Sequence, residues 1–304
     1  MYSNFFEALK TFVPSECVRF DVPLKDFVTM RVGGPAACVV EPQNEEQIAA
    51  IVAAASKAHV PMLVIGNGSN MVISDHGFEG LVLHIGKQFS AVQCENDRII
   101  AQAGALLPVV SRTAAENALT GLEFASGIPG SVGGAAVMNA GAYGGEMQQV
   151  VESVRVLADG EIKTIPVAEL DYAYRHSALL EHDWILLSVT FKLSPGEKDA
   201  IFALMSDLNA RRREKQPLQY PNSGSFFKRP VGHFAGALIQ NAGLKGFSVG
   251  GAQVSELHAG FVINTGDACA NDIYRLMLHV QRTVEDKFGV HMEPEVRLIG
   301  RFDA

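Results

Sequence analysis

The chain has 304 residues, enough for roughly two or three domains with hydrophobic cores of their own. Hydrophobic residues make up 48% and charged residues 19%, a balance that is typical of globular proteins and excludes intrinsic disorder. The formal net charge of -8 argues against a general nucleic-acid binder, and there is no run of about 18 apolar residues to predict a membrane span.

Hydrophobic periodicity predicts the elements of the first half in chain order. Helices are expected at residues 2–11, 45–58 and 107–118, and strands at residues 29–35, 37–40, 61–65, 80–85, 98–101, 151–157 and 184–193. Asp159-Gly160 is typical of a tight hairpin turn, which would join residues 154–157 to residues 162–165. This mixture of many strands and few helices predicts an α+β fold.

A composition change at residues 194–196 marks the expected domain boundary, which gives domains 1–195 and 196–304. In the second domain we expect helices at residues 199–215, 235–241 and 270–288, a strand at 259–263 and a strand-like tail at 293–300. The last of these helices carries its apolar residues along one stripe, so we expect it to pack on a core.

The four cysteines, Cys17, Cys38, Cys94 and Cys269, are far apart and form neither a CxxC pair nor a zinc spacing. None of the histidines falls in an HExxH pattern, so we expect no metal site. The first residues lack the basic start and apolar stretch of a signal peptide. We therefore expect free thiols in a reducing cytoplasm.

Residues 66–70, with the sequence GNGSN, form a first glycine loop directly after the strand expected at 61–65. Unhindered backbone N–H groups and polar side chains suit it to binding an anion, above all a diphosphate. A simple turn is the alternative, because Asn-Gly is common in turns. The loop is not a dinucleotide-binding fingerprint, since Met71 stands where the third glycine would fall and no crossover helix clearly follows.

A second glycine loop, residues 127–134, continues into a segment poor in large side chains that ends at Gly145. Ordered glycine costs conformational entropy, so such a stretch indicates the close approach of another chain segment or of a flat cofactor. A flexible linker is the alternative, but linkers are polar, whereas Ile128 and Val132 are apolar. The two loops could bind two parts of one elongated molecule, with its phosphate at the first loop and its ring at the second.

Polar residues in the second half are candidates for chemistry. The basic run at residues 211–215 is either a solvated helix end or an anion site. Ser225, between a glycine and two phenylalanines, is either a turn serine or lies at the edge of a desolvated pocket. The absence of a G-x-S-x-G motif argues against a nucleophile, but a positioned hydroxyl can donate a proton to a carbanion.

Taken in order, these motifs resemble the UDP-N-acetylenolpyruvoylglucosamine reductase family of flavoenzymes, which form UDP-N-acetylmuramate for peptidoglycan. The matching segments are residues 66–70, 127–134, 139–145, 174–175, 224–228 and 294–297. Each segment is modest alone, but their fixed order over most of the chain is highly specific. The short stretch after Leu193 and residues 142–145 are similar to the family's shorter class, type II, which lacks a substrate-capping insertion.

The resemblance implies an FAD-binding domain of the vanillyl-alcohol-oxidase (PCMH) type, followed by a smaller α+β substrate-binding domain. Some members of that larger group link FAD to His or Cys near the phosphate loop. Residues 66–70 contain neither, so non-covalent FAD is expected. The residues that the resemblance assigns to FAD lie in the two glycine loops and beside them: Gly66, Asn67, Gly68, Ser69, Asn70, Ser126, Gly127, Ile128, Pro129, Gly130, Ser131, Gly133, Gly134, Asn139 and Gly141.

The resemblance also implies the reaction. NADPH reduces the flavin and leaves, and the enolpyruvyl ether of UDP-N-acetylglucosamine then receives hydride from flavin N5 at its vinyl carbon. Arg175 and Glu295 match the positions that stabilise the resulting enolate, and Ser225 matches the proton donor. A guanidinium suits a carboxylate, and fixed donors placed where charge develops are often the largest catalytic contribution.

Further residues match substrate-binding positions, namely Tyr174, Arg212, Lys215, Lys228 and Arg229. Of these, Arg212 and Lys215 match basic residues near the substrate or dinucleotide phosphates. The family usually has Asn at the position of Arg229, so this side chain is expected to pair with a phosphate instead. The implied partners are the UDP-sugar substrate and NADPH, without nucleic acid, membrane or an obligate protein partner.

Three alternatives differ in class. The first is a flavin oxidase of alcohols or hydroxy acids on the same FAD domain, against which the set of Ser225, Arg175 and Glu295 argues. The second is a flavin- or nucleotide-binding regulator without turnover. The third is a globular protein without a cofactor, which would leave the two glycine loops unexplained.

Overall fold

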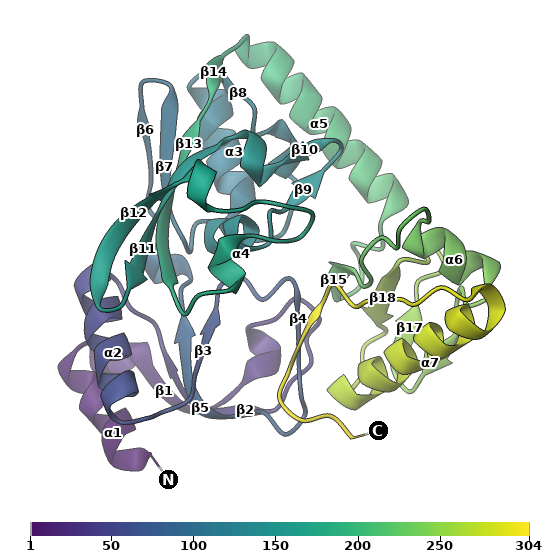
Figure 1. Cartoon of the computed structure of the whole chain (residues 1–304), viewed down its shortest axis with the longest axis horizontal. Coiled ribbons are helices and arrows are strands. Elements are labelled where there is room, and N and C mark those ends of the chain that lie inside the picture. Colours follow the sequence, from purple (N-terminus) through teal and green to yellow (C-terminus); the bar gives the residue numbers. More distant parts are fainter. Residues whose placement is uncertain (1, 304) are drawn as a thin grey trace. The chain divides into compact units, whose positions relative to one another are not determined.

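Helices and strands follow one another without a regular repeat along residues 2–303, the part of the chain that the computed structural model describes (Figure 1). The helices are α1 (Ser3–Ala8), α2 (Glu45–Lys57), α3 (Leu107–Glu116), α4 (Val132–Val137), α5 (Lys198–Lys215), α6 (Ala235–Asn241) and α7 (Ala270–Phe288). The predicted α+β class is confirmed.

Most strands are short. They are β1 (Val18–Pro23), β2 (Pro35–Val40), β3 (Met62–Ile65), β4 (Met71–Ile73), β5 (Phe78–His84), β6 (Val92–Glu95), β7 (Arg98–Gln102), β8 (Leu119–Thr120), β9 (Gly141–Ala142), β10 (Gly145–Glu146), β11 (Val151–Ala158), β12 (Glu161–Pro166), β13 (Ile185–Lys192), β14 (Ser194–Pro195), β15 (Asn222–Ser225), β16 (Ser248–Val249), β17 (Ala252–Val254), β18 (Phe261–Asn264) and β19 (Arg297–Ile299).

The chain divides into two compact units, which differ in their limits from the expected domains 1–195 and 196–304. Unit 1 comprises Met1–Phe20, Cys38–Asn67 and Gly80–Arg212, and unit 2 comprises Asp21–Ala37, Gly68–Glu79 and Arg213–Ala304. Most of α5 belongs to unit 1 because its buried Ile201 and Met205 pack with Ala115 of α3. Unit 2 therefore gains two early segments that local sequence patterns do not reveal.

Unit 1 contains a five-stranded antiparallel sheet in the order β12-β11-β13-β7-β6. The predicted hairpin is confirmed, with Ala158 paired to Glu161 across Asp159 and Gly160, whose φ angles of 54° and 80° are those of a tight turn. A second sheet has the order β1-β2-β5-β3, and β3 and β5 in it are parallel. Helix α4 packs against β13.

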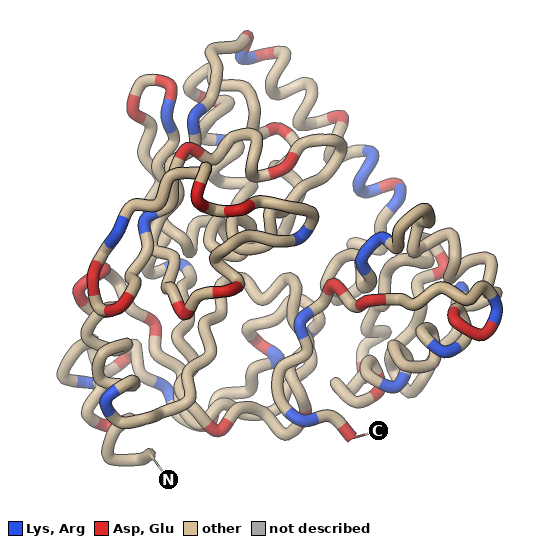
Figure 2. Tube along the Cα trace, in the orientation of Figure 1, with Lys and Arg blue, Asp and Glu red and all other residues tan. Residues whose placement is uncertain are grey.

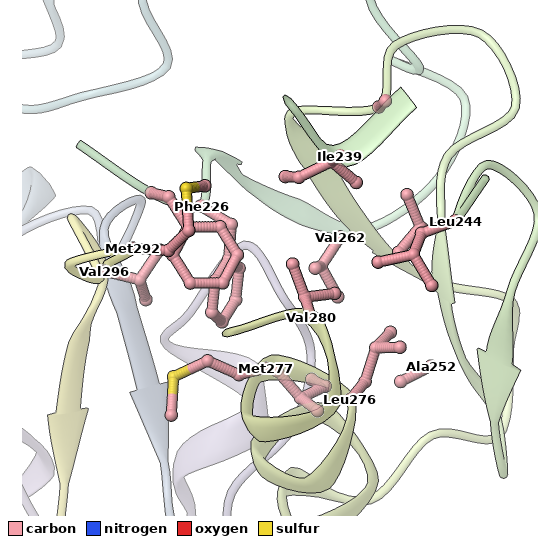
Figure 3. Close-up of a cluster of buried hydrophobic side chains, with 14 of the residues drawn as sticks. Phe226, Ile239, Leu244, Ala252, Val262, Leu276, Met277, Val280, Met292 and Val296 are labelled. Carbon is pink, nitrogen blue, oxygen red and sulfur yellow. The ribbon is translucent and has the colours of Figure 1, made fainter. Parts of the chain in front are cut away.

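Unit 2 is built on a sheet in the order β15-β18-β17-β16, which α7 covers at β16 and β17. Figure 3 shows the core between them, where Phe226 lies beside Met292 and Val296. Helix α7 buries the predicted apolar stripe, begins at a capping box between Cys269 and Asp272, and ends at the left-handed Gly289. Strand β19 pairs with β4 in parallel.

One local prediction fails, and two elements form where none was predicted. Residues 29–34 form a loop instead of a strand, because Arg31 takes a left-handed conformation with φ 56°. Strand β1 lies in a stretch where no element was predicted, and α4 forms within the second glycine loop and its continuation despite two glycines. Among the described residues, no helix is both long and apolar enough to cross a bilayer.

Candidate active site

The two glycine loops meet within unit 1. The side-chain amide of Asn67 donates to the carbonyl oxygen of Pro129 over 2.5 Å. A methyl group on Gly66 would overlap the hydroxyl of the buried Ser131. A larger residue at position 66 would therefore force the Ser131 side chain to move.

The second glycine loop is held by the chain segment before α3. Leu107 N donates to Gly130 O at 3.0 Å, and Gly133 N donates to Ala103 O at 2.8 Å. A Cβ atom on Gly133 would lie 3.0 Å from the Cβ of Ala103. Of the two explanations that the sequence left open for these glycines, close approach of another chain segment applies at Gly133.

Helix α5 brings a buried cation to the start of the second glycine loop. Asn209 donates to the Ser126 hydroxyl at 3.2 Å, and a Cβ atom on Gly127 would lie 3.1 Å from Cδ of Arg212. The Nε and Nη1 atoms of Arg212 are buried and have no hydrogen-bond partner among the described residues. Burial lowers the pKa of this guanidinium, because removal from water disfavours its charge.

Buried polar groups in proteins are normally hydrogen-bonded, and buried charges are normally paired. The unpartnered Nε and Nη1 atoms of Arg212 therefore indicate that the protein binds an anionic or hydrogen-bond-accepting group here. This observation shows that the residues beside the second glycine loop suit a cofactor or substrate that carries negative charge.

Asn139 anchors the loop that carries Arg175. It is fully buried, donates to Glu146 at 3.3 Å and to Ala173 O at 3.0 Å, and accepts from Gln148 N at 3.0 Å. Arg175 Nη1 lies 3.5 Å from Asn139 O. Since the side chain of Asn139 bonds within the protein, its role in the loop is structural, and its contact with FAD stays a prediction.

Arg175 and Asn139 both have left-handed backbones, with φ angles of 56° and 41°. Non-glycine residues pay for this conformation with steric strain, which persists only where the surrounding structure enforces it and which is frequent at functional sites. The guanidinium of Arg175 lies 5.2 Å from the centre of the exposed Tyr174 ring. Gly141 lies in the β9–β10 hairpin, where it pairs with Glu146.

The last three residues of the first glycine loop lie in unit 2 and contact chain segments there. Gly68 has φ 58°, and its Cβ position would overlap Phe27 O, while its own carbonyl accepts from Thr29 N at 3.2 Å. Asn70 donates through its side chain to Glu295 O at 3.1 Å. These contacts give the loop a structural role in unit 2, and a diphosphate contact of Ser69 or Asn70 stays a prediction.

In unit 2, the segment that carries Ser225 is hydrogen-bonded to the segment that carries Glu295. Glu295 N donates to Phe226 O at 2.9 Å, and Phe227 and Pro294 form an antiparallel bridge. Gly224, with φ 75°, lies where the pairing of β15 with β18 becomes irregular, directly before the exposed Ser225. Bulges of this kind redirect side chains beside functional sites. Arg175 belongs to unit 1.

The basic residues predicted to bind the substrate differ in their surroundings. Lys228 Nζ pairs with Glu293 at 2.5 Å, and the Arg229 guanidinium lies 4.8 Å from the centre of the Phe234 ring. Lys215 is exposed at the end of α5, where Figure 2 shows Lys and Arg gathered. Within residues 2–303, no three His, Cys, Asp or Glu side chains come together as metal ligands.

Sequence reasoning missed Asn209 and Asp75. Asn209 is one helical turn before Arg212 on α5, a spacing that places both on one face. The carboxylate of Asp75 accepts from Ala270 N at 2.8 Å and Asn271 N at 2.9 Å, and so caps α7 from outside the helix. Because Asp75 and Ala270 are 195 residues apart, no local sequence pattern reveals their contact.

Two matches to protein families define the class of this protein. Residues 36–166 match the FAD binding domain family. Residues 216–299 match the UDP-N-acetylenolpyruvoylglucosamine reductase, C-terminal domain family. The protein is thus an FAD-binding α+β protein with a smaller second domain, as the sequence predicted.

Three relatives establish the family. The chain is 50% identical to the UDP-N-acetylenolpyruvoylglucosamine reductase of Agathobacter rectalis, over 99% of this chain and 100% of that protein. It is 46% identical to the reductase of Clostridium perfringens, over 99% of both chains. The crystal structure of the Thermus caldophilus enzyme matches with a TM-score of 0.80 and 35% identity, over 93% of this chain and 100% of that one. The chain belongs to the UDP-N-acetylenolpyruvoylglucosamine reductase family, whose members are FAD-dependent oxidoreductases.

Proposed function

We propose that the protein uses NADPH and non-covalent FAD to reduce the enolpyruvyl ether of UDP-N-acetylglucosamine, giving UDP-N-acetylmuramate for peptidoglycan in the cytoplasm. The observation that carries this proposal is the hydrogen bond between Glu295 N and Phe226 O at 2.9 Å. It holds the proposed acid Glu295 next to the segment of Ser225, the proposed proton donor. Identities of 50% and 46% over 99% of the chain, to two relatives named UDP-N-acetylenolpyruvoylglucosamine reductase, support the same substrate.

The residues of unit 1 suit FAD. The first glycine loop approaches the second at Gly66 and Ser131, and Arg212 keeps unpartnered N–H groups beside Gly127. We assign the diphosphate to the first loop and the ring to the second, and residues 66–70 offer no His or Cys for a covalent link. When bound, FAD accepts electrons from NADPH and supplies hydride to the vinyl carbon of the substrate.

The side chains of the protein would then handle charge and protons. Hydride addition places negative charge on the carbon next to the carboxylate. Arg175 binds that carboxylate through its planar guanidinium, and Glu295 stabilises the enolate as a hydrogen-bond donor in its protonated form. Ser225 donates its hydroxyl proton to the carbon, which completes the lactyl ether.

Basic residues would hold the diphosphate of the substrate. Lys228 is paired with Glu293 at 2.5 Å, so substrate phosphate competes with this carboxylate for the ammonium group. Lys215 and Arg229 are exposed and add positive charge, and Tyr174 offers an exposed ring beside Arg175. Arg212 would bind an anionic group at the second glycine loop.

Steady-state NADPH oxidation by the FAD-loaded protein tests the proposal. Oxidation that depends on the enolpyruvyl UDP-sugar, with UDP-N-acetylmuramate as the product, is expected. NADPH oxidation that dioxygen alone sustains, and that the UDP-sugar does not accelerate, would favour a flavin oxidase. Bound FAD with no turnover under either condition would favour a flavin-binding regulator.

A further inference from the structure

We infer that His258 is a positioning residue for the proton-transfer step, because its ring holds the backbone that aligns Ser225 with Glu295. The inference rests on the proposed function. His258 Nδ1 lies 3.1 Å from Gly260 N, and the backbone N–H is the donor. Because a backbone N–H can only donate, Nδ1 must be unprotonated, and the neutral ring carries its proton on Nε2.

A chain of backbone hydrogen bonds leads from His258 to both proposed catalytic residues. Gly260 O accepts from Phe226 N at 2.8 Å, and Phe226 O accepts from Glu295 N at 2.9 Å. Ser225 is the direct neighbour of Phe226 and pairs with Phe261 of β18. The position of Gly260 therefore helps to fix two segments at once, the one with Ser225 and the one with Glu295.

The ring of His258 is itself held in place. The Ser255 hydroxyl accepts from Leu257 N at 3.2 Å and from His258 N at 3.3 Å, which orders the turn. The Phe261 ring packs edge-on, with 4.9 Å between ring centres. A Cβ atom on Gly260 would lie 3.0 Å from Cε1 of His258, so a residue larger than glycine would displace the ring.

Few charged groups surround His258. Lys245 acts on it from the loop after α6, and Glu256 lies two residues before it, with its carboxylate near Gly246. Helix α6 and strands β15 and β18 carry no titratable side chain. Burial lowers the pKa of His258 from its ordinary value, and the positive charge of Lys245 lowers it further. Together they outweigh a hydrogen bond to the backbone of His258 that acts in the opposite direction, so the fold favours the neutral ring.

Protonation would break this arrangement. A proton on Nδ1 turns the acceptor into a donor that faces the N–H of Gly260, and the hydrogen bond is lost. Because the pKa is lowered in the folded protein, the bond is fully present above the ordinary His pKa of about 6.5 and is lost as pH falls through the lower folded value. Alignment of Ser225 with Glu295 should weaken in the same pH range.

Two amide substitutions separate the role of Nδ1 from simple loss of the ring. His258→Asn places an amide oxygen at the position of Nδ1 and cannot be protonated, whereas His258→Gln places its amide at the position of Nε2. The measurement is the anaerobic single-turnover reoxidation of the NADPH-reduced holoenzyme by the enolpyruvyl UDP-sugar, from pH 8 downward. Reduction by NADPH, melting temperature and FAD content serve as controls.

At pH 8 we expect His258→Asn to reoxidise at the wild-type rate within about twofold and His258→Gln to be slower by about tenfold, the loss of one hydrogen bond. The ratio of the wild-type rate to the His258→Asn rate should fall in acid, while the ratio for NADPH reduction stays constant. Equal rates for both variants, or a ratio that does not change with pH, would overturn the inference. Failure of the wild-type protein to reoxidise would instead refute the proposed function.

Nitrogen NMR of ¹⁵N-histidine-labelled holoenzyme gives a readout that does not depend on turnover. We expect a His258 Nδ1 signal of the unprotonated type at pH 8, assigned by its absence from His258→Asn. A protonated Nδ1 at that pH would contradict the inference directly.

Discussion

The side-chain amide of Asn70 donates to the backbone carbonyl of Glu295 at 3.1 Å, and Arg297 N donates back to Asn70 O at 3.0 Å. The end of the first glycine loop thereby fixes the segment that carries the proposed acid. With the bond from Glu295 N to Phe226 O, both backbone polar groups of Glu295 are held within unit 2. The side chain of Glu295 thus extends from a firmly positioned backbone.

Ser225→Ala should leave reduction of the flavin by NADPH nearly normal but slow reoxidation by the enolpyruvyl substrate by roughly 10²- to 10⁴-fold, the usual worth of a positioned general acid. The reason is that protonation of carbon belongs only to the second half-reaction. Stopped-flow traces of the two half-reactions give both rates. Ser248→Ala, a change at an exposed serine of the same unit, is the matched control, and an equal slowing of both half-reactions would rule out the proton-donor role.

Glu295→Gln should likewise spare FAD binding and slow reoxidation, by roughly 10²-fold, since the amide keeps the size of the side chain but removes its acid chemistry. The backbone contacts of Glu295 do not depend on the carboxyl group, so the fold should persist. FAD content and melting temperature check this expectation, with Glu285→Gln on α7 as the control. Loss of FAD from the variant would make Glu295 a structural residue.

Arg212→Met should weaken binding of the anionic group at the second glycine loop by roughly 10- to 100-fold, which is the worth of one or two hydrogen bonds to a charged donor. Little destabilisation of the ligand-free protein is expected, because Nε and Nη1 of Arg212 have no hydrogen-bond partner to lose among the described residues. Titration with FAD and with UDP-N-acetylmuramate measures the affinities. Arg211→Met, which removes an exposed cation paired with Asp207, should change neither, and unchanged binding in Arg212→Met would refute the assignment.

Asn139→Ala should lower the free energy of unfolding by about 3 kcal/mol, because three hydrogen bonds of about 1 kcal/mol each are lost. Asn139→Gly should cost about 1 kcal/mol less, since glycine adopts the left-handed backbone of this position without strain. Urea unfolding of both variants gives the comparison. Equal losses would show that the backbone conformation contributes little.

Much of the fold follows from local pattern. The stripe of α7, the Asp159-Gly160 turn and the β11–β12 hairpin depend on residues that are near one another in the sequence, and these predictions are confirmed. Helix α4 was missed because its glycines have low helix propensity, so packing against β13 decides its conformation. The left-handed turn at Arg31, which replaces a predicted strand, has no glycine at that position to signal it.

The residues of the candidate site could be predicted from the sequence, but the residues that each of them contacts could not. The glycine loops were recognised from composition, yet the contact of Gly66 with Ser131 connects distant segments. The bond from Asn70 to Glu295, which gives a predicted phosphate ligand a structural role, is equally long-range. Hydrophobic periodicity carries no information on such pairs, which explains why the units also differ from the expected domains.

The central claim is that one flavin carries electrons from NADPH to the enolpyruvyl UDP-sugar. An anaerobic stopped-flow recording of flavin absorbance tests it most directly, with NADPH added first and the UDP-sugar second. The account predicts bleaching on the first addition and recovery on the second, with UDP-N-acetylmuramate formed in an amount equal to the flavin. Bleaching without recovery would contradict the assigned substrate and leave only the flavin-binding fold.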